Sequence, residues 1–318
     1  MQPIYNWFFI KNKLVDFIWK LNAISIAAQL LTTPFSIYHF HQFPNFFLLT
    51  NFIAVPLSSL IVLGEILVCA ISFISSLATV TGKLLAWLIW LMNSYIERIG
   101  ELPGSLWCGI QINISQGCLL LLAVAGLGCW FLEKQRKAAW ICLGAVLVFV
   151  FLRSFSFYAC DRQRKIIVYN VPNHQAIDVL NGRNYFFIGD SELLTDEFTR
   201  NFNLTPSRVL HRLKTEGGLR DFCKVENRIA YGSKRILLID RTLIFFPKKE
   251  KITIDLVIIS KNAGIYLSKL AETFTIKQIV FDGSLPRWKL KRLSADCDSL
   301  HISRHDVSEK GAFVMNLD

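Results

Sequence analysis

The stretch that decides the fold runs from Ala27 to Glu65 and reads AAQLLTTPFSIYHFHQFPNFFLLTNFIAVPLSSLIVLGE. It belongs to a longer segment, residues 21–64, that contains no Asp, Glu, Lys or Arg. Residues 102–132 lack these charged side chains as well. Uncharged runs of this length are typical of membrane spans, which need about 20 mainly apolar residues. The sequence therefore predicts a multi-pass integral membrane protein.

Composition separates the chain into two parts. Hydrophobic residues make up 53% of the 318, above the roughly 45–50% of soluble domains. Residues 1–160 carry a net charge of +4, and residues 161–318 carry +7. We expect a membrane domain over 1–160 and a basic soluble domain over 161–318. A basic surface suits anionic lipid or nucleic acid, although a merely solvated surface carries the same charge.

Hydropathy within the membrane domain predicts three firm spans, at about 46–74, 115–132 and 138–157. Prolines at 34, 44 and 56 predict a re-entrant or kinked segment over about 22–42. Residues 11–20 alternate charged and apolar side chains and are expected to form a short interfacial helix. The apolar run 84–96 is too short to cross and is expected to form an interfacial or core helix. Basic residues flank both ends of the last span, which leaves the orientation open.

The soluble half has the pattern of a β-rich α+β domain. Asn181-Gly182 lies between the β-rich segments 174–180 and 183–189 and predicts a type I′ hairpin. Further strands are expected at 165–171, 235–240, 242–246, 253–260, 275–282, 299–303 and 311–317. Helices are expected at 190–198, after Thr205-Pro206, at 264–274 and at 286–297.

Polar side chains are costly at membrane depth, and the quoted stretch holds several beside its prolines. Such groups generally face a cavity or a partner helix, so they are candidates for a transport path. They could equally satisfy one another within a helix bundle. The candidates are Gln29, Thr33, Pro34, His41, Gln42, Pro44, Asn51, Pro56 and Glu65.

The same stretch resembles the ComEC-type competence channel family, whose members carry single-stranded DNA across the bacterial inner membrane. The resemblance lies in Gln29, Thr33-Pro34, the core FHQFP at 40–44, TNF at 50–52 and VPL at 55–57. It is strongest to variants of the Bacteroidetes lineage and covers the C-terminal part of the family architecture. It implies an inner-membrane location, an extracytoplasmic C-terminal domain, and further channel subunits or copies of this chain as partners.

Many members of that family end in a metallo-β-lactamase-like domain with a histidine and aspartate cluster after a strand. The corresponding stretch here places Lys261, Ala263, Ile265 and Tyr266 at the ligand positions. The acidic loop that opens the family's domain corresponds to residues 170–176, NVPNHQA, which hold no acidic side chain. The resemblance therefore implies a degenerate hydrolase fold that is no enzyme and holds no metal or other cofactor.

Two other clusters of the soluble half bear on ligand binding. A basic run with one tryptophan could contact DNA by charge and stacking, although a solvated helix face explains it too. This run consists of Arg287, Trp288, Lys289, Lys291 and Arg292. His301, His305 and Asp306 form the one histidine cluster, and we expect it to be structural or exposed rather than metal-binding.

The leading hypothesis is a membrane component of DNA uptake that helps translocate single-stranded DNA while its C-terminal domain contacts DNA without cutting it. One alternative is a structural membrane protein or a truncated, non-functional remnant of such a channel. Another is an active membrane-anchored metallohydrolase, which the replaced ligands disfavour.

Overall fold

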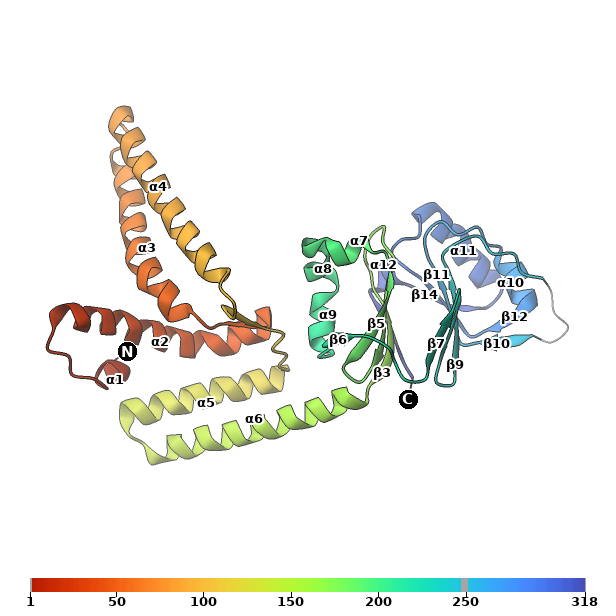
Figure 1. Ribbon diagram of the computed structural model, residues 1–318, viewed down its shortest axis with the longest axis horizontal. Coiled ribbons are helices and arrows are strands. Elements are labelled where there is room, and N and C mark those ends of the chain that lie inside the picture. Colours follow the sequence, from red (N-terminus) through yellow and green to blue (C-terminus); the bar gives the residue numbers. More distant parts are fainter. Residues whose placement is uncertain (1, 247–250, 318) are drawn as a thin grey trace. The chain divides into compact units, whose positions relative to one another are not determined.

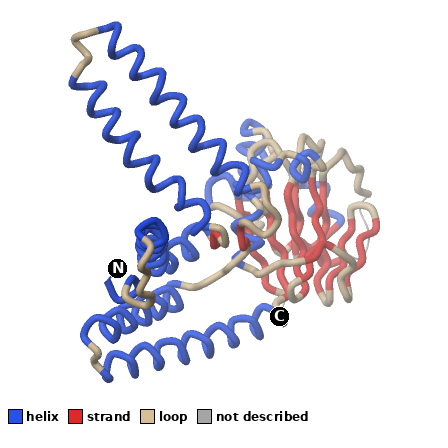
Figure 2. Tube along the Cα trace, turned by 60° about the vertical axis from the view of Figure 1, so that its left-hand side comes forward, coloured by secondary structure: helices blue, strands red, loops and turns tan. Residues whose placement is uncertain are grey.

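Two compact units make up the computed structural model, which describes residues 2–246 and 251–317 (Figure 1). They divide between Ser154 and Phe155, inside one long helix. The boundary predicted at 160/161 falls a little further along the same helix. The first unit is helical, and the second is built on β-sheets (Figure 2).

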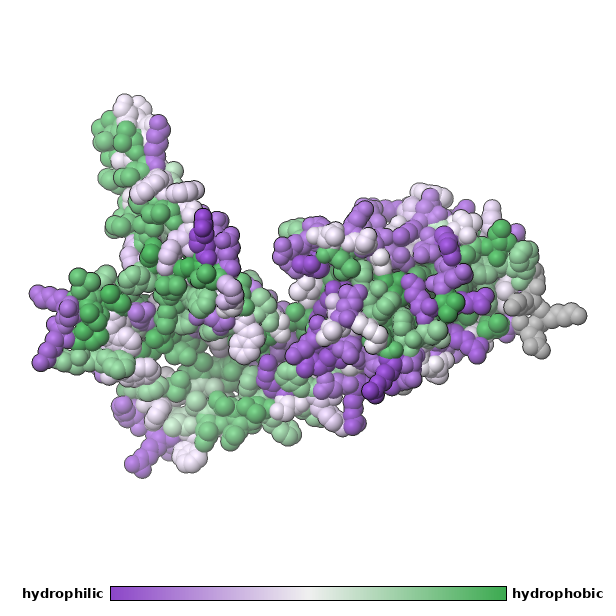
Figure 3. Space-filling model, in the orientation of Figure 1, coloured by the Kyte–Doolittle hydropathy of each residue, from purple (hydrophilic) through white to green (hydrophobic). Residues whose placement is uncertain are grey.

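The N-terminal unit contains a short helix and five long ones within the described residues. Their bounds are α1 Gln2–Tyr5, α2 Lys13–Phe40, α3 Phe47–Ala70, α4 Ser75–Gly100, α5 Ile114–Glu133 and α6 Arg136–Arg162. The five long helices are each long and apolar enough to cross a membrane. Hydrophobic side chains cover much of their surface (Figure 3). Such exposed apolar surface suits contact with lipid.

Five candidate spans replace the three predicted. The interfacial helix expected at 11–20 and the re-entrant segment expected at 22–42 form one continuous helix in the structure, because α2 runs through both. Pro34 is buried inside this helix. Apolar helices tolerate proline where neighbouring groups satisfy the freed backbone. The chain instead turns at His41, which caps α2 with a left-handed φ of 56°.

Helix α4 is much longer than the second helix that was expected to be interfacial. The apolar run at 84–96 is only the middle of a helix that begins at Ser75 and ends at Gly100. Its polar first turns fit an apolar setting because the hydroxyls of Thr79 and Thr81 donate to helix carbonyls, at 2.7 and 2.8 Å. Intrahelical bonds of this kind lower the cost of small polar side chains in lipid.

Two sheets form the centre of the C-terminal unit in the part that the structure describes. The first has the order β15-β3-β4-β5-β6, formed by Phe313–Asn316, Arg164–Val168, Ala176–Asn181, Asn184–Gly189 and Thr215–Glu216. The second has the order β14-β13-β11-β9-β8-β7, formed by Ser303–Asp306, Gln278–Phe281, Leu256–Ile259, Lys234–Ile239, Arg228–Tyr231 and Phe222–Val225. A separate parallel pair joins β10 Ile252–Ile254 to β12 Phe274–Ile276.

Helices cover the outer faces of both sheets. Their bounds are α7 Glu192–Thr195, α8 Glu197–Asn203 and α9 Thr205–Leu210 on the first sheet, α10 Leu267–Thr273 and α11 Arg287–Ser299 on the second, and α12 Val307–Lys310 after β14. Alternation along each strand fills both cores. In β11, Leu256 and Ile258 face the first sheet, while Val257 and Ile259 face α10 and α11. The result is a four-layered sandwich.

The predicted fold class, a polytopic helical membrane domain followed by a β-rich α+β domain, is confirmed. Three local predictions differ. The hairpin at Asn181 forms, but of its two central residues only Gly182 has a positive φ, as in a type II′ turn rather than type I′. Residues 242–246 form no strand. The strand expected at 299–303 begins at Ser303, because α11 continues to Ser299.

Candidate functional site

A cavity of about 370 Å³ lies within the membrane unit where three helices meet two short strands. The strands are β1 Gln42–Pro44 and β2 Leu106–Cys108, which pair antiparallel. The lining residues come from α2, α3, α4 and the two strands, and are Gln29, Pro44, Phe46, Phe47, Thr50, Asn51, Ile96, Ile99, Gly100, Ser105 and Leu106. Most of the wall is apolar, and a few amide and hydroxyl groups interrupt it.

Hydrogen bonds hold this non-helical backbone in place. The Asn45 backbone N–H donates to the Ser105 carbonyl and its side-chain amide to the Gly104 carbonyl, each at 2.8 Å. The Ile110 N–H donates to the His41 carbonyl at 2.9 Å. Irregular backbone inside a membrane protein is tolerated only where its polar groups are satisfied or face a cavity. The segments at 41–45 and 104–110 meet that condition.

The structure brings together some of the predicted path residues. Gln29, Pro44 and Asn51 line the cavity, although they lie on different elements. Thr33 lies beside this group, since its hydroxyl donates to the Gln29 carbonyl at 2.6 Å. Gln42 pairs with Cys108 in the short sheet.

Other path candidates lie elsewhere. The Nδ1 atom of His41 is buried and has no hydrogen-bond partner among the described residues. Pro34 is buried inside α2. Pro56 lies further along α3, and Glu65 is an exposed residue of the same helix, about 21 Å beyond Asn51 at 1.5 Å per residue. Pro34, Pro56 and Glu65 do not line this cavity.

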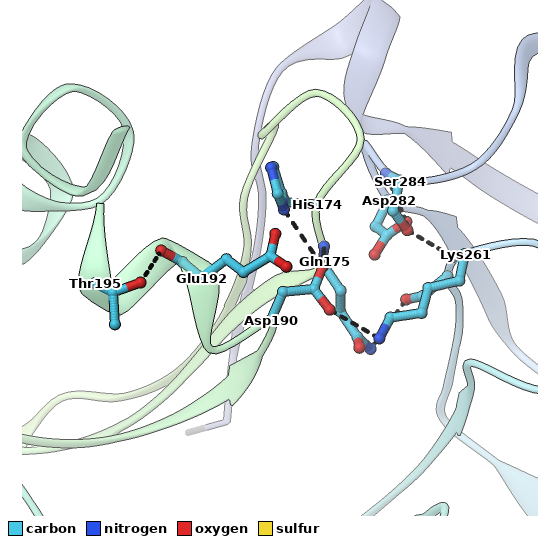
Figure 4. A network of polar contacts seen from close by, with 9 residues as sticks. His174, Gln175, Asp190, Glu192, Thr195, Lys261, Asp282 and Ser284 are labelled. Atoms are coloured by element: carbon cyan, nitrogen blue, oxygen red, sulfur yellow. Dashed lines mark hydrogen bonds and ion pairs between the residues drawn. The ribbon is translucent and has the colours of Figure 1, made fainter. Parts of the chain in front are cut away.

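A second, polar cavity of about 460 Å³ lies at one edge of the C-terminal unit. Its lining comes from loops that follow strands, and consists of Asn173, His174, Asp190, Ser191, Glu192, Lys261, Asn262 and Ser284. The Lys261 ammonium is 2.8 Å from Asp190 Oδ1, and His174 Nδ1 is 3.6 Å from Asp190 Oδ2 (Figure 4). The loops 170–176 and 261–265, which the resemblance singled out, therefore meet here.

Backbone geometry at this cavity is tight. Asn173 and Lys261 both adopt left-handed φ values, 64° and 56°, which is common for Asn and rare for Lys. The Asn173 N–H donates to the Gly283 carbonyl at 3.0 Å. A Cβ atom on Gly283 would lie 2.4 Å from the Val171 carbonyl oxygen. Glycine is thus required for the two loops to approach.

Lys261 and Asp190 each stabilise the charged form of the other. A hydrogen bond from Lys261 and one from the Gln175 backbone lower the pKa of Asp190, although burial alone would raise it. The hydrogen bond to Asp190 in turn raises the pKa of Lys261. Both groups are therefore charged at neutral pH. A protonated ammonium has no lone pair, so Lys261 cannot ligate a metal in this state.

Asp282 lies behind this pair and is fully buried. Its Oδ1 accepts hydrogen bonds from the backbone N–H and the hydroxyl of Ser284, at 3.0 and 2.6 Å. Its Oδ2 has no partner among the described residues. Burial raises the pKa of Asp282 to about 6, against the lowering effect of these hydrogen bonds.

Sequence reasoning missed Asp190, Asp282 and Ser284. A signal was present, because Asp190 directly follows β5 and Asp282 directly follows β13. Polar residues at the carboxyl ends of sheet strands often meet in one crevice.

The remaining ligand positions are unsuited to a metal. Ala263 and Ile265 are buried and have no donor atom, and Tyr266 is exposed. His305 contacts the Gly311 carbonyl oxygen through Nε2, and Asp306 caps α12 by accepting from the Ser308 N–H. Within residues 2–246 and 251–317, no three His, Cys, Asp or Glu side chains are grouped so that they could hold a metal.

The basic run 287–292 forms the first turns of α11. Arg287, Trp288, Lys291 and Arg292 are exposed. Lys289 does not share this surface, because it is buried and donates to Asn262 Oδ1 at 3.0 Å. Lys289 is therefore not part of the exposed basic surface that the sequence predicted for this run.

These features define a polytopic membrane protein with a C-terminal four-layered sandwich domain. Two family models match it: the competence protein model over residues 5–156 and the ComEC C-terminal domain model over residues 166–317. The chain belongs to the ComEC-type competence family and is a membrane component of DNA uptake. A comparison with curated proteins found no match, and one with solved structures found none either.

Proposed function

We propose that this protein helps translocate single-stranded DNA across the inner membrane, past the cavity of its membrane unit. The observation that carries the proposal is that Gln29, Pro44 and Asn51, which belong to separate parts of the competence motif, line one cavity. Amide side chains in an otherwise apolar wall can bond to bases or phosphates without holding them by charge. Such weak contacts suit a path through which a strand must keep moving.

Replacement of Asn51 by Leu tests this proposal. It keeps the side-chain volume roughly constant and removes the amide from the cavity wall. We expect transformation of host cells that carry only this variant to fall at least about tenfold, equivalent to about 1.4 kcal/mol on the limiting barrier. Ser59→Leu is the matched control, because Ser59 is an exposed residue of α3 that does not line the cavity. Equal transformation by both variants at equal protein levels would contradict the proposal.

The C-terminal unit, in our proposal, contacts DNA without hydrolysing it and is a degenerate form of the metallo-β-lactamase-like fold. Support comes from Lys261, whose ammonium is held by Asp190 at a position where that fold needs a metal ligand. The exposed residues Arg287, Trp288, Lys291 and Arg292 are the proposed contact with DNA.

Incubation of the purified full-length protein with single-stranded DNA and Zn²⁺ or Mn²⁺ tests the absence of hydrolysis. We expect the DNA to remain intact at protein concentrations that bind it. Cleavage that requires the metal and disappears in Asp190→Asn would overturn this part of the proposal and favour a membrane-anchored hydrolase.

The charges in the segments between spans support one sidedness for this protein. When α2 to α6 all cross, the segment before α2 and the turn between α5 and α6 lie on the same side, opposite the C-terminal unit. These two segments carry or adjoin Lys11, Lys134 and Arg136, whereas residues 41–46 and 101–113, which lie between spans on the opposite side, carry no Lys or Arg. Short basic loops stay in the cytoplasm. We therefore propose an extracytoplasmic C-terminal unit on a protein of the inner membrane.

One chain supplies only a small part of a conduit. Its membrane cavity measures about 370 Å³, and large apolar side chains remain exposed on α3 and α4. We propose that further channel subunits or copies of the same chain cover these surfaces and complete the path.

A further inference from the structure

The last turns of α6 belong to the C-terminal unit, which begins at Phe155. Gln163 alone separates the end of α6 at Arg162 from the start of β3 at Arg164. Its side chain is buried, and its amide donates to the carbonyls of Gly182 and His211, at 2.9 and 2.7 Å. The last candidate span therefore passes directly into the fold of this unit.

A second contact fixes the end of α6 beside α9. The Arg212 guanidinium lies 3.9 Å from the centre of the Phe157 ring and donates to the Ser156 hydroxyl at 3.2 Å. Arg212 follows the C-terminal end of α9 by two residues. Phe155, Phe157 and Tyr158 form an aromatic group just before the charged residues that end α6. Aromatic rings followed by charges are typical of the membrane–water interface, so the end of α9 lies at that level.

Exposed hydrophobic side chains continue from this point along α9 and α8. Leu210 is exposed at the end of α9, and Phe198 and Phe202 are 79% and 73% exposed on α8. The two rings lie parallel, with centroids 6.2 Å apart. Leu204, which joins the two helices, is completely buried in the core below them. A firmly anchored helix thus presents two large rings to the outside.

The charge near Phe198 and Phe202 distinguishes between DNA and lipid as the partner of these rings. Asp196 and Glu197 immediately precede Phe198, and Glu197 is paired with Arg200 at 4.0 Å. A carboxylate pair beside the rings repels the phosphates of a DNA strand, and no net positive charge compensates for it. Insertion into the apolar part of a lipid interface needs only the rings.

We infer that Phe198, Phe202 and Leu210 form a membrane-contact face of the C-terminal unit and insert into the interface of the same bilayer that α6 spans. With α6 this face makes a second point of attachment. It couples the polar cavity to the membrane surface, since Ser191 and Glu192, which line that cavity, begin the short helix α7 that precedes α8. The inference does not depend on DNA binding.

Photo-crosslinking of the full-length protein in liposomes tests this face. Benzoylphenylalanine replaces Phe198 or Phe202 in two separate variants, and Phe246 in a control. Phe246 is 76% exposed as well, but its carbonyl accepts from Thr273 at the end of α10, on the opposite outer layer of the sandwich. After irradiation, lipid adducts are quantified by mass spectrometry, with and without single-stranded DNA.

We expect lipid adducts at positions 198 and 202 at several times the yield at position 246, unchanged by DNA. Equal yields at the three positions would overturn the inference. Adducts to DNA or to a second protein chain at 198 and 202, in place of lipid, would also overturn it and assign the face to that partner.

Discussion

At the scale of single residues, the buried carboxyl of Asp282 makes a definite prediction. Its pKa of about 6 in the folded protein lies above the value of about 3.9 expected in an unfolded chain. Between these values the folded state holds a proton that the unfolded state has released. This group therefore lowers stability as the pH rises from about 4 to 6, by up to about 3 kcal/mol, and has no further effect above that.

Asp282→Asn isolates this effect. The asparagine keeps the oxygen that accepts from Ser284 and cannot ionise. We expect the unfolding temperature of the wild type, measured in detergent, to fall relative to that of the variant as the pH rises from 4 to 6. Parallel pH profiles for the two proteins would show that Asp282 does not titrate in this range.

Helix packing at the scale of elements depends on Gly126 in α5. A Cβ atom there would lie 3.0 Å from the Ala138 carbonyl oxygen and 3.2 Å from Cys142 Cβ of α6. Small residues allow such close approach of membrane helices. We expect Gly126→Val to destabilise the α5–α6 pair by about 1–3 kcal/mol, the usual cost of overpacking. The decrease in the unfolding temperature of the variant in detergent, relative to the wild type, measures this destabilisation.

Gly128 provides the control for this prediction. It lies on the same helix, and a Cβ atom there would meet no atom within 4 Å. Gly128→Val therefore changes helix propensity by the same amount as Gly126→Val but adds no clash with α6. Equal destabilisation by both variants would show that propensity, rather than the contact with α6, explains the loss.

The helices and strands also show which parts of the structure the sequence alone could predict. The spans over α3, α5 and α6 and the hairpin β4–β5 follow from local composition, so the sequence was sufficient. The extents of helices α2 and α4 were not found, because Pro34 indicates a break in the first helix and Lys83 and Glu97 limit the second apolar run. The polar cavity needs β11 and β13 to be neighbours in one sheet and needs the other sheet, which contains β5, to pack against it, and neither follows from local pattern.

At the scale of the whole molecule, the two units share one structural arrangement. In each, irregular loops are held close by backbone hydrogen bonds, at 41–45 and 104–110 in the membrane unit and around Asn173 and Gly283 in the C-terminal unit. Each set of loops borders a cavity whose lining lies within the range that one family model matches. In both units, irregular backbone between regular elements therefore contributes to the candidate site.

Topology gives the last prediction, because an odd number of spans places the two ends of the membrane unit on opposite sides. A reporter that is active only in the cytoplasm, inserted before α2 at Lys11, should therefore be active. The same reporter fused after the C-terminal unit should be inactive, and an enzyme active only outside the cytoplasm should show the reverse. Four crossings, with α4 lying in the interface, would put both fusions on the same side of the membrane. Activity of the cytoplasmic reporter at both positions would therefore remove α4, the helix that the sequence judged too short, from the set of spans.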